Sequence, residues 1–280
     1  IAFHNRRHNK AADSSLHSKN SKYQKISEMT AKELFLFDIF SYSCMNCLRS
    51  LDYIKKLDNK YKKYGLKTIL IHTHEWNFEK DGNNIIRAAK KYKINVPIII
   101  DKDKKIIKNL KINFWPAQVL IKNSKIVYRH IGEGSYRKLE EKIRKILKIK
   151  SDALFNKEPK YSKFPTIYAG RGKKGRLSEL KDVLKFGIIY KNGAWKQNEE
   201  SLTGKGSLAI KTKGKVVSMV ASSINKKTIK INIKLNNETN KNISVNEPRL
   251  YDITKLRNNK SRILELSTKS KIAVYSFAFQ

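Results

Sequence analysis

The two cysteines of the chain, Cys44 and Cys47, lie three positions apart, between an apolar run and an amphipathic segment. The run at residues 33–40 is mostly apolar and predicts a buried strand. Apolar side chains then recur at helical spacing over residues 47–64, which predicts a helix. A framework of structural disulfides would need more cysteines. The pair therefore indicates thiol chemistry at a strand-to-helix junction.

The rest of the first half continues this alternation of strand and helix patterns. The predicted elements are a strand at 67–73, a helix at 84–92, a strand at 97–101, a short helix at 104–110, a hairpin of strands at 117–122 and 125–131, and a helix at 136–148. This order predicts a central sheet covered by helices, an α/β thioredoxin-like layout with an insertion.

The pattern changes after about residue 150. Short alternating strands are predicted at 207–211, 216–222, 228–235, 262–266 and 271–279, which favours an all-β sandwich. The expected domains are a flexible N-terminal segment at 1–28, the redox domain at 29–150, a linker at 151–164 and the β-sandwich at 165–280. Since the chain begins with isoleucine, we expect that a leader or membrane segment was removed or that this is part of a longer polypeptide.

The position of each cysteine predicts its role. Cys44 lies just before the predicted helix, where free N–H groups and the helix dipole favour its thiolate. We expect Cys44 to attack a disulfide and Cys47, one turn on and more enclosed, to resolve the mixed disulfide. Asp38 interrupts an apolar strand, and a buried carboxyl group there could exchange a proton with Cys47. The alternative is an aspartate that points to the surface at the strand end.

Other polar and aromatic residues extend the candidate site. A cis Pro116 before the hairpin would expose the backbone of Trp115 to a substrate chain. His72 and Glu75 follow the second strand and predict a structural or substrate-lining role. A zinc site built from these residues and the cysteines is the less favoured alternative, because the ligand spacing is unlike that of a zinc finger.

The chain carries a formal net charge of +37, yet its lysines are spread over all predicted elements. A diffuse charge favours a general compositional bias over a specific nucleic-acid site. Adhesion to anionic envelope polymers or lipid headgroups stays open as a secondary effect.

Several motifs together resemble the DipZ-type thioredoxin-like proteins of the TlpA-like and AhpC-TSA superfamily. They are the segment Phe40-Ser-Tyr-Ser-Cys-Met-Asn-Cys-Leu-Arg49, His72-Thr-x-Glu75 with Phe78-Glu-Lys80, Trp115-Pro-Ala117, His130-Ile-Gly-Glu-Gly-Ser-Tyr136, Tyr168-Ala-Gly-Arg-Gly172, Trp195, Pro248-Arg-Leu-Tyr251 and Val274-Tyr-Ser-Phe-Ala-Phe279. His74 and Trp76 depart from the commoner Pro and Phe of this family.

The resemblance implies a redox domain joined to a carbohydrate-binding-module-like, jelly-roll-like sandwich outside the cytoplasmic membrane. It also implies electron supply by a CcdA-like or DsbD-like membrane domain, and substrate contacts by Tyr42, His72, Glu75, Trp115 and Pro116. In this interpretation an envelope glycan could bind the β domain.

The predicted function is an extracytoplasmic thiol–disulfide oxidoreductase, a reductase or electron relay that acts on protein thiols and disulfides. It would use no cofactor beyond a redox-active Cys44–Cys47 disulfide. The alternatives are a thiol peroxidase and a non-catalytic envelope-binding protein whose disulfide is structural. Tyr168, Trp195 and Tyr251 could stack on a sugar, but core roles are favoured.

Overall fold

The computed structural model describes residues 33–158, 164–181, 183–236, 241–255, 258 and 260–280. The chain divides into two compact units, Ile1–Pro159 and Lys160–Gln280, which we describe separately. The predicted flexible segment at 1–28 and part of the predicted linker at 151–164 lie outside the described residues.

The first unit is built on a five-stranded sheet of order β3-β2-β1-β4-β5. Its strands are β1 (Leu34–Phe40), β2 (Leu66–His72), β3 (Ile98–Ile100), β4 (Ala117–Lys122) and β5 (Lys125–Ile131). The central strand β1 pairs in parallel with β2 and antiparallel with β4. The strands predicted from the apolar runs and from the hairpin are confirmed, with ends that differ by a residue or two.

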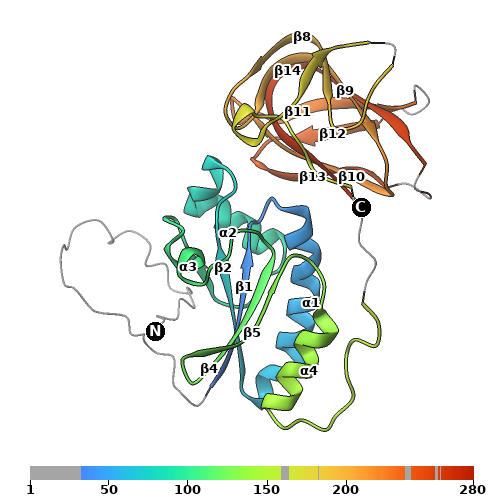
Figure 1. Ribbon diagram of the computed structural model, residues 1–280. Coiled ribbons are helices and arrows are strands. Elements are labelled where there is room, and N and C mark those ends of the chain that lie inside the picture. The colour runs from blue at the N-terminus through green and yellow to red at the C-terminus, as the bar shows by residue number, and fades with distance from the viewer. Residues whose placement is uncertain (1–32, 159–163, 182, 237–240, 256–257, 259) are drawn as a thin grey trace, which may run out of the picture. The chain divides into compact units, whose positions relative to one another are not determined.

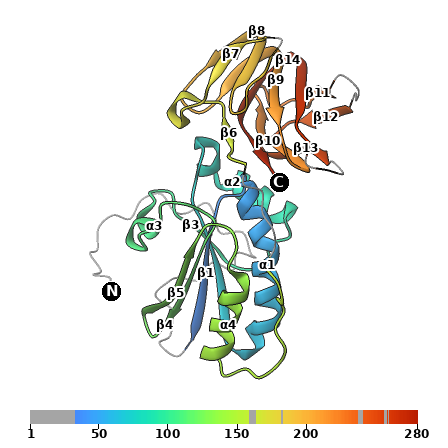
Figure 2. The ribbon, with the colours of Figure 1, turned by 45° about the vertical axis from the view of Figure 1, so that its right-hand side comes forward.

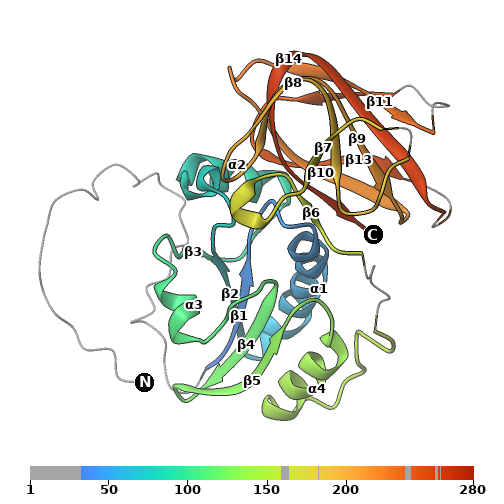
Figure 3. The ribbon, with the colours of Figure 1, turned by 45° about the horizontal axis from the view of Figure 1, so that its top comes forward.

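Four α-helices cover this sheet: α1 (Met45–Tyr61), α2 (Gly82–Lys91), α3 (Lys105–Asn109) and α4 (Tyr136–Ile146). Short 3-10 turns η2 (Lys62–Tyr64) and η3 (Asn77–Lys80) follow α1 and precede α2. Helices α1 and α4 lie together on one face of the sheet and α3 lies on the other (Figures 1 and 3). The rings of Tyr53 and Tyr136 stack with centroids 4.2 Å apart, which joins α1 to α4.

Strand β1 is buried on both faces, as its apolar sequence predicts. Its alternate residues Phe35, Phe37 and Ile39 belong to one cluster with Ile107 of α3 and Leu110, which follows that helix. Because side chains of a strand alternate between faces, position 38 points to the opposite face, towards α1. The fold thus places the aspartate of β1 beneath the helix that carries the cysteines.

The second unit is all-β, as predicted. Its strands are β6 (Ile167–Tyr168), β7 (Leu177–Glu179), β8 (Ile189–Gln197), β9 (Leu202–Thr212), β10 (Val216–Ser223), β11 (Ile229–Leu235), β12 (Lys241–Val245), β13 (Arg249–Lys255) and β14 (Arg262–Phe279), with a 3-10 turn η4 (Arg171–Lys173). Within the described residues these strands form one hydrogen-bonded sheet that curls over (Figure 2). It encloses a large apolar cluster, and a smaller cluster of Leu184, Tyr190 and Ala209 lies apart from it.

Strand β14 corrects one sequence expectation. The two strands predicted at 262–266 and 271–279 are a single strand with a register shift between Thr268 and Ile272. Its first part pairs with β11 and its last part with β10, so β14 links both sides of the core. Strands β6, β7, β8, β12 and β13 were not predicted, because they are short or carry glycine, asparagine and lysine at exposed positions.

Candidate active site

Cys44 caps the N-terminus of α1. Its backbone is extended (φ −81°, ψ 117°), and its sulfur accepts a hydrogen bond from the backbone N–H of Cys47 at 3.3 Å. Both cysteines are free thiols; Cys44 is partly exposed, whereas Cys47 has no exposed surface. Cys44, the more accessible of the two cysteines, therefore lies at the positive end of the helix dipole.

Cys47 lies in a different electrostatic environment. Burial is the main cause that raises the pKa of its thiol, and the hydrogen bond and charge of Cys44 raise it further. The charge of Asp38 acts in the same direction. Cys47 therefore holds its proton more strongly than an exposed thiol, and it needs a nearby base to become a nucleophile.

Asp38 supplies a carboxyl group in this interior. It is fully buried, which excludes the alternative of an aspartate that points to the surface. Gln118 Nε2 donates to Asp38 Oδ1 at 2.9 Å and to Ser50 Oγ of α1 at 3.2 Å. Burial raises the pKa of Asp38 to about 7, although the bond from Gln118 opposes this shift. A carboxyl group with this pKa can gain or lose a proton near neutral pH.

Glu79 is a second buried carboxylate, which the sequence analysis did not assign to the site. Its Oε1 accepts from Ser41 Oγ (2.6 Å), Ser43 Oγ (2.8 Å) and Ser43 N (3.2 Å), and its Oε2 accepts from the N–H groups of Glu75 and Trp76. Burial raises the pKa of Glu79 to about 7, and these hydrogen bonds oppose the shift. Glu79 ties the loop that enters α1 to the loop after β2. Its turn is too short to show a periodic pattern, so only the Phe78-Glu-Lys80 motif marked it.

Tyr42 and His72 require a correction. Each side chain is only 1% exposed, and their rings stack with centroids 5.4 Å apart. Burial, helped by the charge of His74, lowers the pKa of His72 to about 3, so the imidazole is neutral. These side chains do not line the exposed surface, and the expected direct contact with substrate does not fit their positions. They pack beneath the site instead.

Trp115 and Pro116 lie next to β1. Their peptide bond is cis, and Gly132 N donates to Pro116 O at 2.8 Å. The register pairs Ile39 with Ala117, so this segment lies beside the end of β1 that leads to the cysteines. Trp115 is partly exposed and Pro116 is buried. The partly exposed Glu75 belongs to the neighbouring loop after β2.

An ion pair joins α1 to the loop after β5. Arg49 Nε and Nη2 donate to the two carboxylate oxygens of Glu133 at 2.7 and 2.6 Å, and Nη2 also donates to Asn46 Oδ1. Through Arg49, this two-point contact fixes Asn46, which lies between the cysteines, relative to the β4–β5 hairpin. Arg49 and Glu133 both belong to motifs that the sequence analysis quoted, but their partnership became visible only in the fold.

Within the described parts of the chain, no three His, Cys, Asp or Glu side chains are grouped so that they could hold a metal ion. None of the helices described is long and apolar enough to cross a membrane.

The aromatic motifs of the second unit are mostly core residues. Trp195 is 8% exposed and Tyr251 is 4% exposed, whereas Tyr168 is partly exposed. The burial of the first two favours their predicted core role over a sugar-stacking face.

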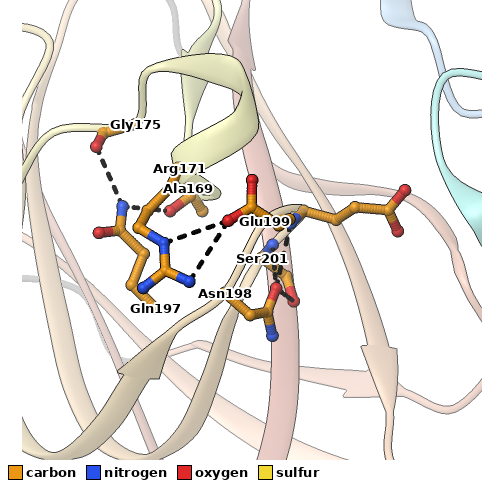
Figure 4. Close-up of polar contacts among 8 residues, drawn as sticks. Ala169, Arg171, Gly175, Gln197, Asn198, Glu199 and Ser201 are labelled. Atoms are coloured by element: carbon orange, nitrogen blue, oxygen red, sulfur yellow. Dashed lines mark hydrogen bonds and ion pairs between the residues drawn. The ribbon is translucent and has the colours of Figure 1, made fainter.

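The glycine-rich loop after β6 is held against the β8–β9 turn (Figure 4). Gln197 Nε2 donates to Ala169 O at 2.8 Å and to Gly175 O at 3.0 Å, while Arg171 pairs with Glu199 at 3.3 Å. A Cβ at Gly170 would lie 2.3 Å from Glu199 O, so the two backbones approach too closely for a side chain. Gly170 and Gly172 therefore allow the loop backbone to pack closely against the backbone of Glu199.

Comparison with known proteins places these features in a family. A family model described as "Thioredoxin like C-terminal domain" matches residues 179–279. "Protein DipZ" of Mycobacterium tuberculosis is 36% identical over 117 residues, which cover 41% of this chain and 17% of that protein. "Thiol-disulfide oxidoreductase ResA" of Bacillus cereus is 29% identical over 122 residues, or 43% of this chain and 67% of that protein. The chain thus spans less than a fifth of the length of DipZ.

Among solved structures, StoA from Bacillus subtilis is 18% identical with a TM-score of 0.35, covering 39% of this chain and 81% of that one. A likeness this low adds nothing to the assignment, which depends on the sequence families. The family model described as "Redoxin" matches residues 7–147, half of the 280 residues, including both cysteines, and the chain therefore belongs to the redoxin family.

Proposed function

We propose that this protein is a thiol–disulfide oxidoreductase that acts through Cys44 and Cys47. The observation that carries the proposal is the asymmetry of the pair. A reachable sulfur caps a helix, and a buried thiol with a raised pKa lies close enough to a buried carboxyl group for their charges to interact. A structural disulfide would need neither the exposed sulfur nor the buried acid.

The reaction proceeds in two exchanges. The thiolate of Cys44 attacks one sulfur of a substrate disulfide, which breaks the S–S bond, forms a mixed disulfide and releases the first substrate thiolate. Asp38, in its ionised form, accepts the proton of Cys47. The Cys47 thiolate then attacks Cys44 Sγ and releases the second substrate thiolate. The chain becomes a Cys44–Cys47 disulfide, and the substrate gains two electrons. Asp38 returns the proton of Cys47 to one substrate thiolate, and the other thiolate takes its proton from solvent.

The finer assignment is a DipZ-like reductase or electron relay outside the cytoplasmic membrane, with a CcdA-like or DsbD-like membrane donor. Similarity to DipZ and the shared motifs support it. In this interpretation the donor reduces the Cys44–Cys47 disulfide after each turnover. The burial of Trp195 and Tyr251 gives no support to a glycan site, so the proposal includes none.

A Cys47→Ser variant tests the division of roles. It should retain substrates as mixed disulfides on Cys44 that a reductant releases, and mass spectrometry of tryptic peptides would locate the bond. The matched Cys44→Ser variant should trap nothing and should lose disulfide exchange. Exchange that persists in Cys44→Ser, or trapping at another residue, would refute the proposal.

A further inference from the structure

Several loops converge at one edge of the first sheet, the edge that carries Cys44. Thr73 N donates to Phe40 O at 2.9 Å, and Asp101 N donates to His72 O at 2.9 Å, so the loops after β1, β2 and β3 follow one another. The segment before β4 joins them, because Ala117 pairs with the end of β1. The surroundings of the reactive sulfur therefore come from residues far apart in sequence.

This edge exposes aromatic surface. Phe114 is 72% exposed, whereas the other exposed large hydrophobic residues among positions 33–158 are at most 42% exposed. It immediately precedes Trp115, and Lys104 Nζ lies 5.4 Å from the centroid of the Trp115 ring. An aromatic side chain this exposed beside a reactive site is a common anchor for a protein partner.

Positive charge gathers at the same edge. Burial is the main cause that lowers the pKa of His74, and the charges of Lys104 and Lys80 lower it further. Both ammonium groups therefore lie near enough to His74 for their charges to act on it. Lys80 is exposed, and its ammonium group donates to the neutral Asn77 Oδ1 at 2.9 Å.

The acidic residues nearby are mostly directed towards backbone amides. Both carboxylate oxygens of Asp101 accept from N–H groups of α3, at 3.1 and 3.0 Å. Asp81 Oδ1 accepts from an N–H group of α2 at 2.9 Å, and Glu79 is buried. Two further accessible acids are described at this edge: the partly exposed Glu75, and Asp103, whose side chain is 72% exposed and lies 3.6 Å from Lys105 Nζ. They are outnumbered by Lys80, Lys102, Lys104 and Lys105. The electrostatic potential that a docking chain meets at this edge is therefore expected to be positive.

We propose that Phe114, Trp115, Lys80 and Lys104 form a docking surface, here called the aromatic–basic edge, for an extended polypeptide whose cysteine is flanked by an apolar and an acidic residue. The proposal rests on the proposed function and narrows its substrate to this class. The aromatic rings would cover the apolar side chain, and the lysines would attract the acidic one.

The experiment uses the 280-residue chain and three disulfide-linked peptides that share one leucine beside the cysteine. They differ only in two flanking residues, which are glutamate, glutamine or lysine. A small neutral disulfide, bis(2-hydroxyethyl) disulfide, serves as a substrate without flanking residues. Rates are measured at low and high salt, and each variant is normalised to its own rate with the small disulfide.

We expect kcat/KM for the glutamate peptide to exceed that for the lysine peptide by roughly tenfold at low salt, and the preference to shrink at high salt. The double variant Lys80→Glu, Lys104→Glu should remove or invert the preference. Phe114→Ser should raise KM for all three peptides by about fivefold to tenfold through lost apolar contact. The matched control is Lys63→Glu, an exposed lysine beyond the far end of α1, which should behave as wild type.

Equal rates for the three peptides, or a preference that survives the double charge reversal, would overturn the docking proposal. Turnover of the small disulfide in that case would leave the proposed function intact. No exchange with any of the four substrates would overturn the proposed function, and the docking proposal with it.

Discussion

Replacing Asp38 by asparagine tests whether a titrating carboxyl group lies beneath the cysteines. The substitution conserves shape, and the asparagine amide can still contact Gln118, whose Oε1 has no hydrogen-bond partner in the described structure. It removes the charge alone. The effect should therefore appear as a change in how stability depends on pH.

The pKa shift of Asp38 sets the size and the sign of this effect. Burial raises its pKa from 3.8 to about 7, so the folded chain binds a proton that the unfolded chain releases between these values. The stability linked to this proton is fully present below pH 3.8 and is lost as the pH rises through 7. Between pH 5 and pH 8 the loss amounts to roughly 2.5 kcal/mol. Asp38→Asn should gain about this much relative to wild type over the same interval.

Pulsed hydrogen exchange of a peptide that covers β1, measured along a urea gradient with the reduced chain, reports the stability of the first unit. Asp52→Asn is the matched control, because the side chain of Asp52 is 75% exposed and its pH dependence should match wild type within about 0.5 kcal/mol. Glu79 is present in every variant, so its own titration cancels in the comparison. A difference between Asp38→Asn and wild type that changes by less than about 0.5 kcal/mol from pH 5 to pH 8 would refute the raised pKa.

Four further substitutions test contacts in the two units. Arg49→Met removes the ion-pair partner of Glu133, whose side chain is 7% exposed. It should destabilise the first unit by about 3 kcal/mol in the same urea assay, and no measurable loss of stability would show that solvent screens the pair. Glu79→Gln should lower the stability of the first unit by roughly 2 kcal/mol in the same assay, because an amide group replaces one acceptor oxygen of a carboxylate that binds two serine hydroxyls and three backbone N–H groups. Unchanged stability would show that these bonds do not hold the two loops together. Gly204→Ala, whose Cβ would lie 2.0 Å from a backbone oxygen of β8, should unfold the second unit selectively, as seen by exchange of β9. Gly82→Ala, with nothing within 4 Å of its Cβ, is expected to be neutral or stabilising.

The sequence by itself determined the local features of the redox site. The apolar run of β1, the spacing of the cysteines and the helical periodicity that follows act over short distances, so they are readable from neighbouring residues. They predicted the strand, the helix and the greater burial of the second cysteine correctly. The burial of Asp38 was also predictable, because a carboxyl group within a continuous apolar strand points to the core.

Tertiary structure decided what these residues contact. Gln118 lies 80 positions from Asp38, and Glu133 lies 84 positions from Arg49, and no local pattern links such pairs. Glu79 joined the site in the same way, by folding back on serines more than 35 positions earlier. Each of these contacts depends on how the strands are ordered in the sheet.

The same limit explains the errors. The family resemblance implied substrate contacts for His72 and Tyr42, yet both residues are only 1% exposed in the folded chain. In the second unit, the polar stretch within β14 was interpreted as a turn between two strands. It stays extended because β14 pairs with β9 on both sides of the register shift. Sequence patterns report which side chains favour burial, whereas hydrogen-bond partners and coverage by distant loops are set only when the strands assemble.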